Sequence, residues 1–260
     1  MKAVILAGGF GTRISEESHM RPKPMIEIGG APILWHIMKY YSFYGFNEFV
    51  ICCGYMGYII KQYFADYYLH RSDVTFDFSA ENKIVIHSNI AEPWKVTVVD
   101  TGFSTQTGGR IKRIAQYIGN ERFMMTYGDG LSDIDLSKLI KTHEQSGNTV
   151  TLSAIQPGGR FGVLDINDRD GSITGFHEKA QEEGAWINAG FMVMEPDVFN
   201  YIDGDESIFE RQPLETLSAA GKLGVYRHYG YWQCMDTARD KSALEAAWAS
   251  GSAKWKLWDN

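Results

Sequence analysis

The first half of the chain alternates between short runs that are apolar throughout and longer segments with helical spacing. The helical segments are 31–45, 56–69 and 108–119, and the apolar runs between them are VILA (4–7), EFVICC (48–53), KVTVVD (95–100) and RFMMTY (122–127). Strands without a polar face are typical of a parallel sheet that helices cover on both sides. The pattern therefore predicts an α/β fold with a central, mostly parallel sheet.

Two parts of the chain add antiparallel pairs to this pattern. Residues 72–90 contain two alternating segments around Glu81-Asn82, which predict a β-hairpin inserted into the α/β core. The second half is richer in strands, with TVTLSAIQ, WINAGFMVM and an Asp170-Gly171 hairpin turn inside FGVLDINDRDGSITGFHEKA. Because no linker or low-complexity tract divides the halves, we expect one domain over residues 1–260. Residues 1–135 and 136–260 would form the two sides of a cleft.

Composition excludes several classes of partner. The net charge is -7 and no run of lysine or arginine is present, which argues against a nucleic-acid partner. No apolar stretch approaches the length of a membrane helix, and Met1-Lys2 leads directly into a strand without a signal peptide. We therefore expect a cytoplasmic protein without a membrane partner. Three cysteines, Cys52, Cys53 and Cys234, cannot build a disulfide framework and are expected to be reduced thiols.

The first apolar run leads into a glycine-rich loop, LAGGFGTR, at residues 6–13. Closely spaced glycines after a strand let backbone N–H groups approach a phosphate. A dinucleotide fingerprint would need a third glycine where Ile14 stands, and a P-loop would need a Gly-Lys pair that this loop lacks. Instead Arg13 follows the last glycine, and a Pro-Lys-Pro stretch holds Lys23. The loop is thus interpreted as a phosphate cradle with two cations, suited to stabilising a pyrophosphate leaving group.

Aspartates follow two other apolar runs. Asp129 comes after FMMTYG, at the carboxyl end of a predicted strand, and Asp236 ends YWQCMDT before a helix. Each is a candidate Mg²⁺ ligand, although Asp236 also suits a helix cap. Asp133 and Asp135, at the start of the next helix, are assigned to capping and to compensation of the helix dipole.

LAGGFGTR and PKPM, together with YGDG, FGVLD, FHEK, INAG and WQCMDT, resemble the signature of the sugar-phosphate nucleotidyltransferases. The resemblance covers essentially the whole chain and implies the family's fold, a Rossmann-like mixed, mostly parallel sheet with helices on both faces. VILAGGFGTRISEES, TGGRIKR and TYGDG are most similar to members of the family that make CDP-glucose. The substrates implied are CTP and α-D-glucose 1-phosphate, and the second product is pyrophosphate.

The same resemblance implies roles for individual residues. Asp129 and Asp236 would hold Mg²⁺, and Arg13 and Lys23 would be catalytic. Residues 1–135 would be the nucleotide-binding half and 136–260 the sugar-phosphate-binding half. The nucleotide would contact Leu6, Ala7, Gly8, Gly9, Phe10, Gly11, Thr12, Arg13, Lys23, Thr105, Arg110 and Gly128. The sugar phosphate would contact Gly162, Glu178, Lys179, Asn188 and Gly190, with Ala180 standing where the family has proline.

A site that selects cytosine must offer an acceptor for its amine and a donor for its ring nitrogen. The resemblance implies that Thr105 and Arg110 read the base, because they match polar positions that this group of the family places near the nucleotide. The resemblance further implies a homo-oligomer such as a hexamer, with apolar surface on the 72–90 hairpin and on WKLW (255–258) at the subunit contacts. Three alternatives stay open. They are a nucleotidyltransferase for UTP, dTTP or another sugar 1-phosphate, a regulatory subunit that binds nucleotide sugars without catalysis, and a metabolite dehydrogenase.

Overall fold

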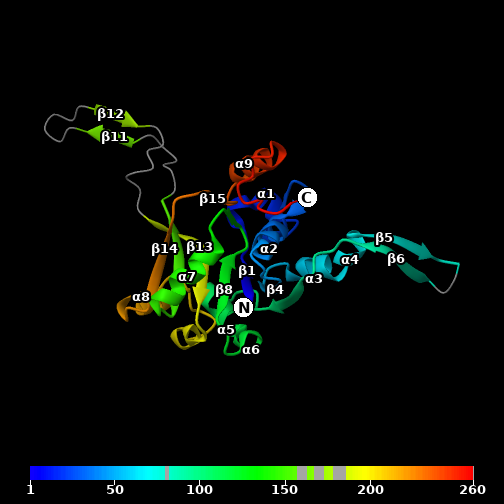
Figure 1. Cartoon of the computed structure of the whole chain (residues 1–260), viewed down its shortest axis with the longest axis horizontal. Coiled ribbons are helices and arrows are strands. Elements are labelled where there is room, and N and C mark those ends of the chain that lie inside the picture. Colours follow the sequence, from blue (N-terminus) through cyan, green and yellow to red (C-terminus); the bar gives the residue numbers. More distant parts are fainter. Residues whose placement is uncertain (80–81, 157–162, 167–172, 178–185, 260) are drawn as a thin grey trace.

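The computed structural model describes residues 1–79, 82–156, 163–166, 173–177 and 186–259 (Figure 1). Its centre is a seven-stranded sheet to which both halves of the chain contribute. In spatial order the strands are β14 (Leu223–His228), β10 (Val150–Ile155), β13 (Ile187–Met194), β8 (Phe123–Tyr127), β1 (Ala3–Ala7), β4 (Glu48–Cys53) and β7 (Lys95–Asp100).

The sheet is mixed and mostly parallel, as expected. β1 runs parallel to both β4 and β8, β4 runs parallel to β7, and β10 runs parallel to β14. Only β13, among these seven strands, is antiparallel to its neighbours, β10 and β8. Because β1 and β8 are parallel neighbours, their carboxyl ends meet at one edge of the sheet, where sites in open α/β folds lie.

Helices cover both faces because the central strands are apolar on both sides. Ala3, Ile5 and Ala7 of β1 belong to one buried cluster, whereas Val4 and Leu6 belong to the other. The first cluster is covered by α2 (Ile33–Phe43), α3 (Gly57–Ala65), α7 (Leu136–Ser146) and α9 (Ala238–Ala249). The second is covered by α5 (Thr107–Arg113), α6 (Ala115–Ile118), the 3₁₀ segment η3 (Pro196–Tyr201) and α8 (Gln212–Ala219).

The expected inserted hairpin is confirmed. After α4 (Tyr67–His70), β5 (Ser72–Asp77) and β6 (Lys83–Asn89) pair antiparallel as a separate two-stranded sheet. Figure 1 shows this hairpin extending away from the central sheet. A second antiparallel pair joins β11 (Val163–Ile166) to β12 (Ile173–His177). The predicted Asp170-Gly171 turn between these strands lies outside the described residues.

Short elements carry much of the site. η1 (Thr12–Ile14) and α1 (Ser15–Ser18) follow the glycine loop, η2 (Lys23–Met25) carries the central lysine, and β2 (Glu27–Ile28) pairs with β3 (Ala31–Pro32). β9 (Gly130–Ser132) pairs antiparallel with β15 (Trp232–Cys234), which the sequence did not predict. No helix within the described ranges is both long and apolar enough to cross a membrane.

Part of the apolar surface expected at WKLW is buried within the chain itself. Trp255 of the WKLW segment is fully buried, and Leu257 and Trp258 pack against the core that contains α2. The indole N–H of Trp255 donates to Nδ1 of the buried His36 at 3.4 Å. The segment therefore closes over its own chain, since a tryptophan side chain gains more from a full apolar pocket than from a solvated surface.

Candidate active site

A cavity of about 360 Å³ opens at the carboxyl ends of β1 and β8. All twelve residues predicted to contact the nucleotide line it, and so does Asp129. Residues that are up to 122 positions apart in the chain, from Leu6 to Gly128, are thus brought around one space. Their contacts with a nucleotide remain a prediction.

The glycine loop keeps its backbone open to this cavity. Gly11 has a φ of +64°, a conformation that favours glycine, and its carbonyl accepts a hydrogen bond from the Ile14 N–H at 3.0 Å as η1 begins. Gly128 on the opposite wall has no room for a side chain, because a Cβ there would lie 2.8 Å from Pro24 and 3.0 Å from the Leu6 carbonyl oxygen. The two walls of the cavity are therefore in close contact at their base.

Arg110 is the polar group that holds the glycine loop. Its guanidinium is almost fully buried and donates to the carbonyl oxygens of Gly8 at 3.0 Å, Cys53 at 3.1 Å and Gly102 at 2.8 Å. The guanidinium also donates to the Thr101 hydroxyl at 2.8 Å and to the Phe103 carbonyl oxygen at 3.4 Å. A Cβ on Gly8 would lie 2.2 Å from this guanidinium. Gly8 is required because the arginine passes directly against it.

These contacts bear on the predicted role of Arg110 as a reader of the base. Its guanidinium donates to four backbone carbonyl oxygens and one hydroxyl, and in this way the arginine ties the glycine loop to the 101–103 segment. Thr105 is also buried, and its hydroxyl lies where a Cβ on Gly102 would collide. Both residues line the cavity, but the geometry of Arg110 is that of a positioning residue.

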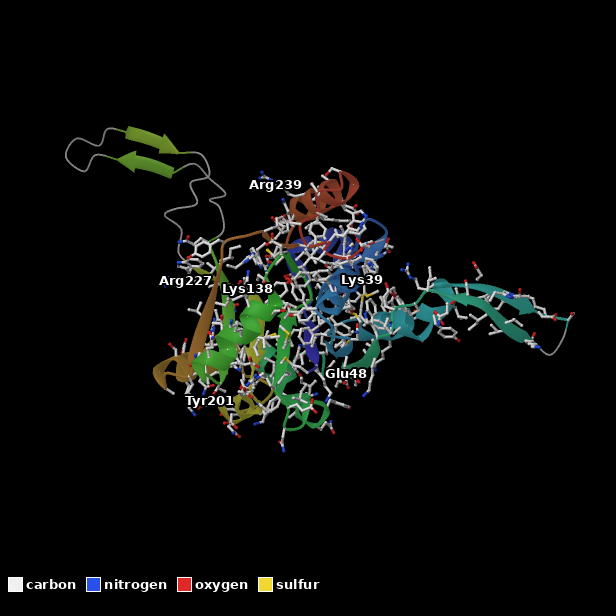
Figure 2. The ribbon with its side chains drawn as sticks, in the orientation of Figure 1. Lys39, Glu48, Lys138, Tyr201, Arg227 and Arg239 are labelled. Atoms are coloured by element: carbon white, nitrogen blue, oxygen red, sulfur yellow. The ribbon has the colours of Figure 1, made fainter. Side chains whose placement is uncertain are left out.

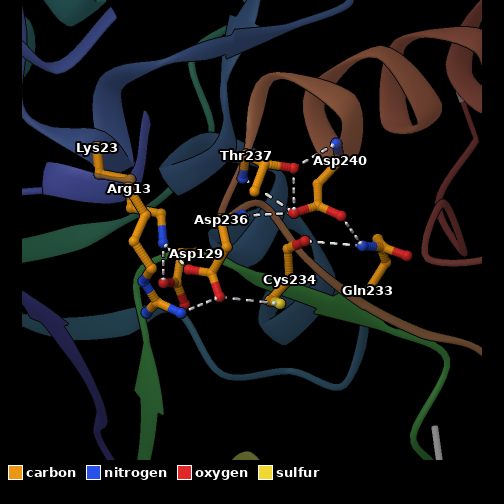
Figure 3. Close-up of polar contacts among 8 residues, drawn as sticks. All are labelled: Arg13, Lys23, Asp129, Gln233, Cys234, Asp236, Thr237 and Asp240. Atoms are coloured by element: carbon orange, nitrogen blue, oxygen red, sulfur yellow. Dashed lines mark hydrogen bonds and ion pairs between the residues drawn. The ribbon is translucent and has the colours of Figure 1, made fainter. Parts of the chain in front are cut away.

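Lys23 lies between the two aspartates singled out from the sequence (Figure 3). Its Nζ is 2.5 Å from Oδ2 of Asp129 and 2.6 Å from Oδ1 of Asp236, and its side chain is only 11% exposed. Burial by itself lowers the pKa of the Lys23 ammonium, but the two carboxylates outweigh that effect and raise the pKa above its usual value. Lys23 is therefore a fully charged cation at neutral pH.

Arg13 supplies a second cation on the solvent side of the same cluster. Its Nη1 is 2.6 Å from Oδ2 of Asp236, while its side chain is 72% exposed. Burial raises the pKa of the Asp236 carboxyl, but Lys23 and Arg13 together lower it by a greater amount. Asp236 is thus an ionised carboxylate that touches both predicted catalytic cations.

The pairing of β9 with β15 brings Asp129 and Asp236 together. Cys234 lies opposite Gly130, and the Met235 N–H donates to the Asp129 carbonyl oxygen at 2.9 Å. Asp129 directly precedes β9 and Asp236 lies two residues after β15, so the two carboxylates meet at the same end of this strand pair. Asp236 is not the cap of α9, because Thr237 and Asp240 form that capping box.

Asp133 and Asp135, the two other aspartates near this site, have different roles. Asp135 is the N-cap of α7 and accepts from the Lys138 N–H at 3.0 Å, as predicted. The capping role predicted for Asp133 is wrong. Its carboxylate accepts from the Tyr231 N–H at 2.7 Å and lies 2.8 Å from Nε2 of His228, so it holds the chain entering β15.

On the sugar-phosphate side, the structure describes two of the five predicted residues. Asn188 and Gly190 lie on β13, where the side-chain amide oxygen Oδ1 of Asn188 accepts from the Gly190 N–H at 2.8 Å. Gly190 has a φ of +86°, and a Cβ there would lie 2.6 Å from the ring of Tyr127, which lines the cavity. Gly162, Glu178 and Lys179 lie outside the described residues, as does Ala180.

The cavity wall also contains residues that the sequence analysis did not select. They come from the segment between β7 and α5, from the first residue of α5, from the end of β8 and from η2: Phe103, Ser104, Gln106, Thr107, Tyr127 and Pro24. The signal was present, because the polar, glycine-containing run TGFSTQTGGR follows a buried strand. Tyr127 is recognisable only in three dimensions, since its hydroxyl donates to Glu210 from the second half of the chain.

The carboxylates of Asp129 and Asp236 could serve as oxygen ligands for a divalent cation at this cavity. Within the described ranges no group of three or more His, Cys, Asp or Glu side chains forms a metal site. However, Asp129 and Asp236 already share one cation, the Lys23 ammonium. Two carboxylates with substrate phosphates and waters make a normal Mg²⁺ shell, so this donor set fits magnesium. Cys234 is half-buried beside them, and burial together with the two carboxylates raises the pKa of its thiol to about 12.

A glycine loop with an arginine and a lysine, facing two carboxylates at the edge of a mixed sheet, defines a site for nucleotidyl transfer from a nucleoside triphosphate. The chain belongs to the nucleotidyl transferase family, whose model matches residues 2–243. It is 55% identical over 260 residues, the full length of both chains, to a glucose-1-phosphate cytidylyltransferase of Salmonella typhimurium.

A probable glucose-1-phosphate cytidylyltransferase of Bacillus subtilis is 44% identical over 99% of this chain and 100% of its own length. Among solved structures, that of HddC from Yersinia pseudotuberculosis aligns with a TM-score of 0.69 at 25% identity. The alignment covers 95% of this chain and 99% of that one. The fold and the family expected from the sequence are both confirmed.

Proposed function

We propose that the protein transfers the cytidylyl group of CTP to α-D-glucose 1-phosphate, forming CDP-glucose and pyrophosphate. The observation that carries this proposal is full-length similarity, at 55% and 44% identity, to two proteins described as glucose-1-phosphate cytidylyltransferases. The cavity supports the chemistry, because the residues of the glycine loop, Arg13 and Lys23 all line one space.

In the proposed reaction, a phosphate oxygen of glucose 1-phosphate attacks the α-phosphorus of CTP in line. The bond from the α-phosphorus to the bridging oxygen breaks, and that oxygen leaves with pyrophosphate. Arg13, the more exposed cation, would contact the β- and γ-phosphates, and Lys23 would contact the α-phosphate. These cations reduce the repulsion between two anionic substrates and hold the reacting groups close together, so no protein nucleophile is needed.

We also propose that Asp129 and Asp236 hold Mg²⁺ during turnover. A bound magnesium ion would supply neutralisation of the charge that develops on the phosphates. The two carboxylates would then exchange the Lys23 ammonium for the metal ion, and the lysine would turn to the substrate phosphate.

The predicted sugar-phosphate contacts have a separate test. Lys179→Ala should raise the KM for glucose 1-phosphate with little change in CTP affinity measured without the sugar. Weaker CTP binding with an unchanged KM for the sugar phosphate would place Lys179 in the nucleotide half of the cleft. Ala180→Pro should leave activity similar or slightly higher, because proline stiffens the backbone there without removing a contact.

The proposed reaction is tested by pyrophosphate release with each nucleoside triphosphate against glucose 1-phosphate and Mg²⁺. We expect a strong preference for CTP. Equal rates with UTP or dTTP would contradict the assignment of the base, and release with another sugar 1-phosphate alone would contradict that of the sugar. Absence of any release, with nucleotide sugar bound, would favour a regulatory subunit.

We further propose a homo-oligomer that acts in the cytoplasm. The β5–β6 hairpin, which stands apart from the core, supports the oligomer, because Phe76 of β5 is 51% exposed and Phe78, just after β5, is 82% exposed. Ile84 and Ile86 of β6 are also exposed. Light scattering after size exclusion should show a multiple of the 29.3 kDa chain mass. Phe76→Ser with Phe78→Ser should lower that mass.

A further inference from the structure

Asp240 is a buried carboxylate in the first turn of α9, beside the candidate active site (Figure 3). The residue is 9% exposed, whereas its neighbour Arg239, labelled in Figure 2, is exposed at the surface of the helix. The first turn of α9 therefore directs one charge toward solvent and one toward the interior. A buried charge is costly unless donors surround it, so the donors around Asp240 show which parts of the chain it holds.

Part of the hydrogen bonding of Asp240 belongs to the capping box of α9. Oδ2 of Asp240 accepts from the Thr237 N–H and from the Thr237 hydroxyl, both at 2.9 Å. In return, the Asp240 N–H donates to the Thr237 hydroxyl oxygen at 3.2 Å. These bonds satisfy backbone groups at the N-terminus of the helix, and a helix of any function could have them.

Two further bonds of the same carboxylate reach beyond the helix. Oδ2 accepts from the backbone N–H of Asp236 at 3.1 Å, and Oδ1 accepts from the side-chain amide of Gln233 at 3.1 Å. Gln233 is the central residue of β15, and its amide nitrogen also donates to the Cys234 carbonyl oxygen at 2.8 Å. Asp240 therefore connects α9 both to the proposed metal ligand Asp236 and to the strand that precedes it.

The chain around Asp236 is thus held from two sides. On one side, the Met235 N–H donates to the carbonyl oxygen of Asp129, the other proposed ligand, at 2.9 Å. On the other side, the Asp236 N–H is held by Asp240. Because an aspartate side chain is short, the position of its carboxylate follows that of its backbone. Mg²⁺ requires oxygen ligands in nearly octahedral positions at about 2.1 Å, so a small rotation of this backbone would disturb the pair of carboxylates.

We infer that Asp240 is a positioning residue for Asp236. Its carboxylate holds the backbone of Asp236 and the side chain of Gln233, and so directs the Asp236 carboxylate toward Asp129 and Lys23. Residues that orient the ligands of a metal without touching it change metal affinity by about 10- to 100-fold when they are replaced. The inference rests on the proposed role of Asp236 in holding Mg²⁺, because Asp240 acts only through that residue.

Binding of Mn²⁺, a paramagnetic substitute for Mg²⁺, to the full chain without nucleotide tests this role, with free Mn²⁺ measured by electron paramagnetic resonance. Asp240→Asn should weaken Mn²⁺ binding by about tenfold or more, because an amide cannot accept hydrogen bonds at both of its ends. With CTP and glucose 1-phosphate, this variant should need about tenfold more Mg²⁺ for half-maximal pyrophosphate release. Its kcat at saturating Mg²⁺ should change by less than about threefold, because Asp240 does not touch the substrates.

Two further variants separate positioning from helix capping and from charge. Thr237→Ala removes the hydroxyl of the capping box but keeps both bonds that reach beyond the helix. It should lower the urea midpoint, as Asp240→Asn does, but change Mn²⁺ affinity by less than about twofold. Gln233→Met removes the bond to Oδ1 without changing any charge. It should also weaken Mn²⁺ binding, which the loss of a nearby negative charge could not explain.

Mn²⁺ binding that is equal in Asp240→Asn and in the unmodified chain would overturn the inference. Equal weakening by Thr237→Ala and Asp240→Asn would also overturn it, since the effect would then come from the helix cap. Should Asp240→Asn fail to fold, unchanged Mn²⁺ binding by Gln233→Met would refute the inference. If Mn²⁺ did not bind the unmodified chain, the metal role of Asp236 would be wrong, and the inference with it. A failure of the proposed reaction looks different, because the unmodified enzyme would then release no pyrophosphate whatever its Mn²⁺ affinity.

Discussion

Replacing Arg110 by methionine tests two possible roles of this residue. Either it acts as a clamp, which holds the glycine loop through its hydrogen bonds, or it recognises the base of the nucleotide directly. The variant keeps an apolar stem inside the protein but removes all the donors that reach Gly8, Cys53, Gly102, Phe103 and a threonine hydroxyl. If each bond contributed independently at about 1.5 kcal/mol or more, the sum would exceed about 7 kcal/mol. The structure indicates a much smaller loss.

Two features reduce that sum. The Cys53 carbonyl keeps the Thr101 N–H at 2.9 Å, and the Gly8 carbonyl keeps a weak donor, the Tyr55 N–H at 3.4 Å. The Gly102 carbonyl lies close enough to the surface to be solvated. In addition, burying a charged guanidinium is costly, and this burial lowers the pKa of Arg110. We expect Arg110→Met to lower the free energy of unfolding by about 2 kcal/mol.

The assays are urea denaturation and titration with CTP and UTP. A clamp predicts that both nucleotides bind more weakly by a similar factor, because the whole glycine loop loses its support. Arg113→Met is the control, since Arg113 lies on the same helix but pairs with Asp205 at the surface. Unchanged stability together with lost discrimination between CTP and UTP would refute the clamp and support direct reading of the base.

The remaining predictions concern the carboxylates, the lysine and a buried histidine. Asp129→Asn and Asp236→Asn should each nearly abolish pyrophosphate release while the far-UV spectrum is retained. A variant with near-normal rate at limiting Mg²⁺ would not be a metal ligand. Lys23→Ala should lower kcat by about 100-fold or more while raising the KM for CTP far less, because a preorganised charge acts mainly in the transition state. An unchanged kcat would make it a binding residue only. Burial lowers the pKa of His36 to about 4, so the unfolded chain takes up a proton near pH 6.5 before the folded one does. Stability should therefore fall by about 2 kcal/mol between pH 7 and pH 4.5 from this group. The fall should be smaller in His36→Asn, and an identical fall would contradict the assignment.

Local sequence was sufficient for the elements whose signals lie within a few neighbouring residues. VILA followed by glycines predicted β1 and its loop, because apolar runs and glycine conformations are short-range properties. The alternation around Glu81-Asn82 predicted the hairpin for the same reason. The same local signals placed Asp129 at the carboxyl end of a strand.

Tertiary structure decided which of these residues meet and what each one does. Asp129 and Asp236 are 107 positions apart and meet because β9 pairs with β15, two strands of three residues each whose local signal is weak. Arginine is a residue type that often binds ligands. The guanidinium of Arg110, however, donates to backbone carbonyls that only the folded chain brings around it. The sequence shows that Trp255 is apolar but not which surface it packs against. The tertiary structure places it in the core of its own chain, beside α2. Strand pairing and close packing bring together segments that are distant in the chain, so these contacts cannot be predicted from the local pattern of residues.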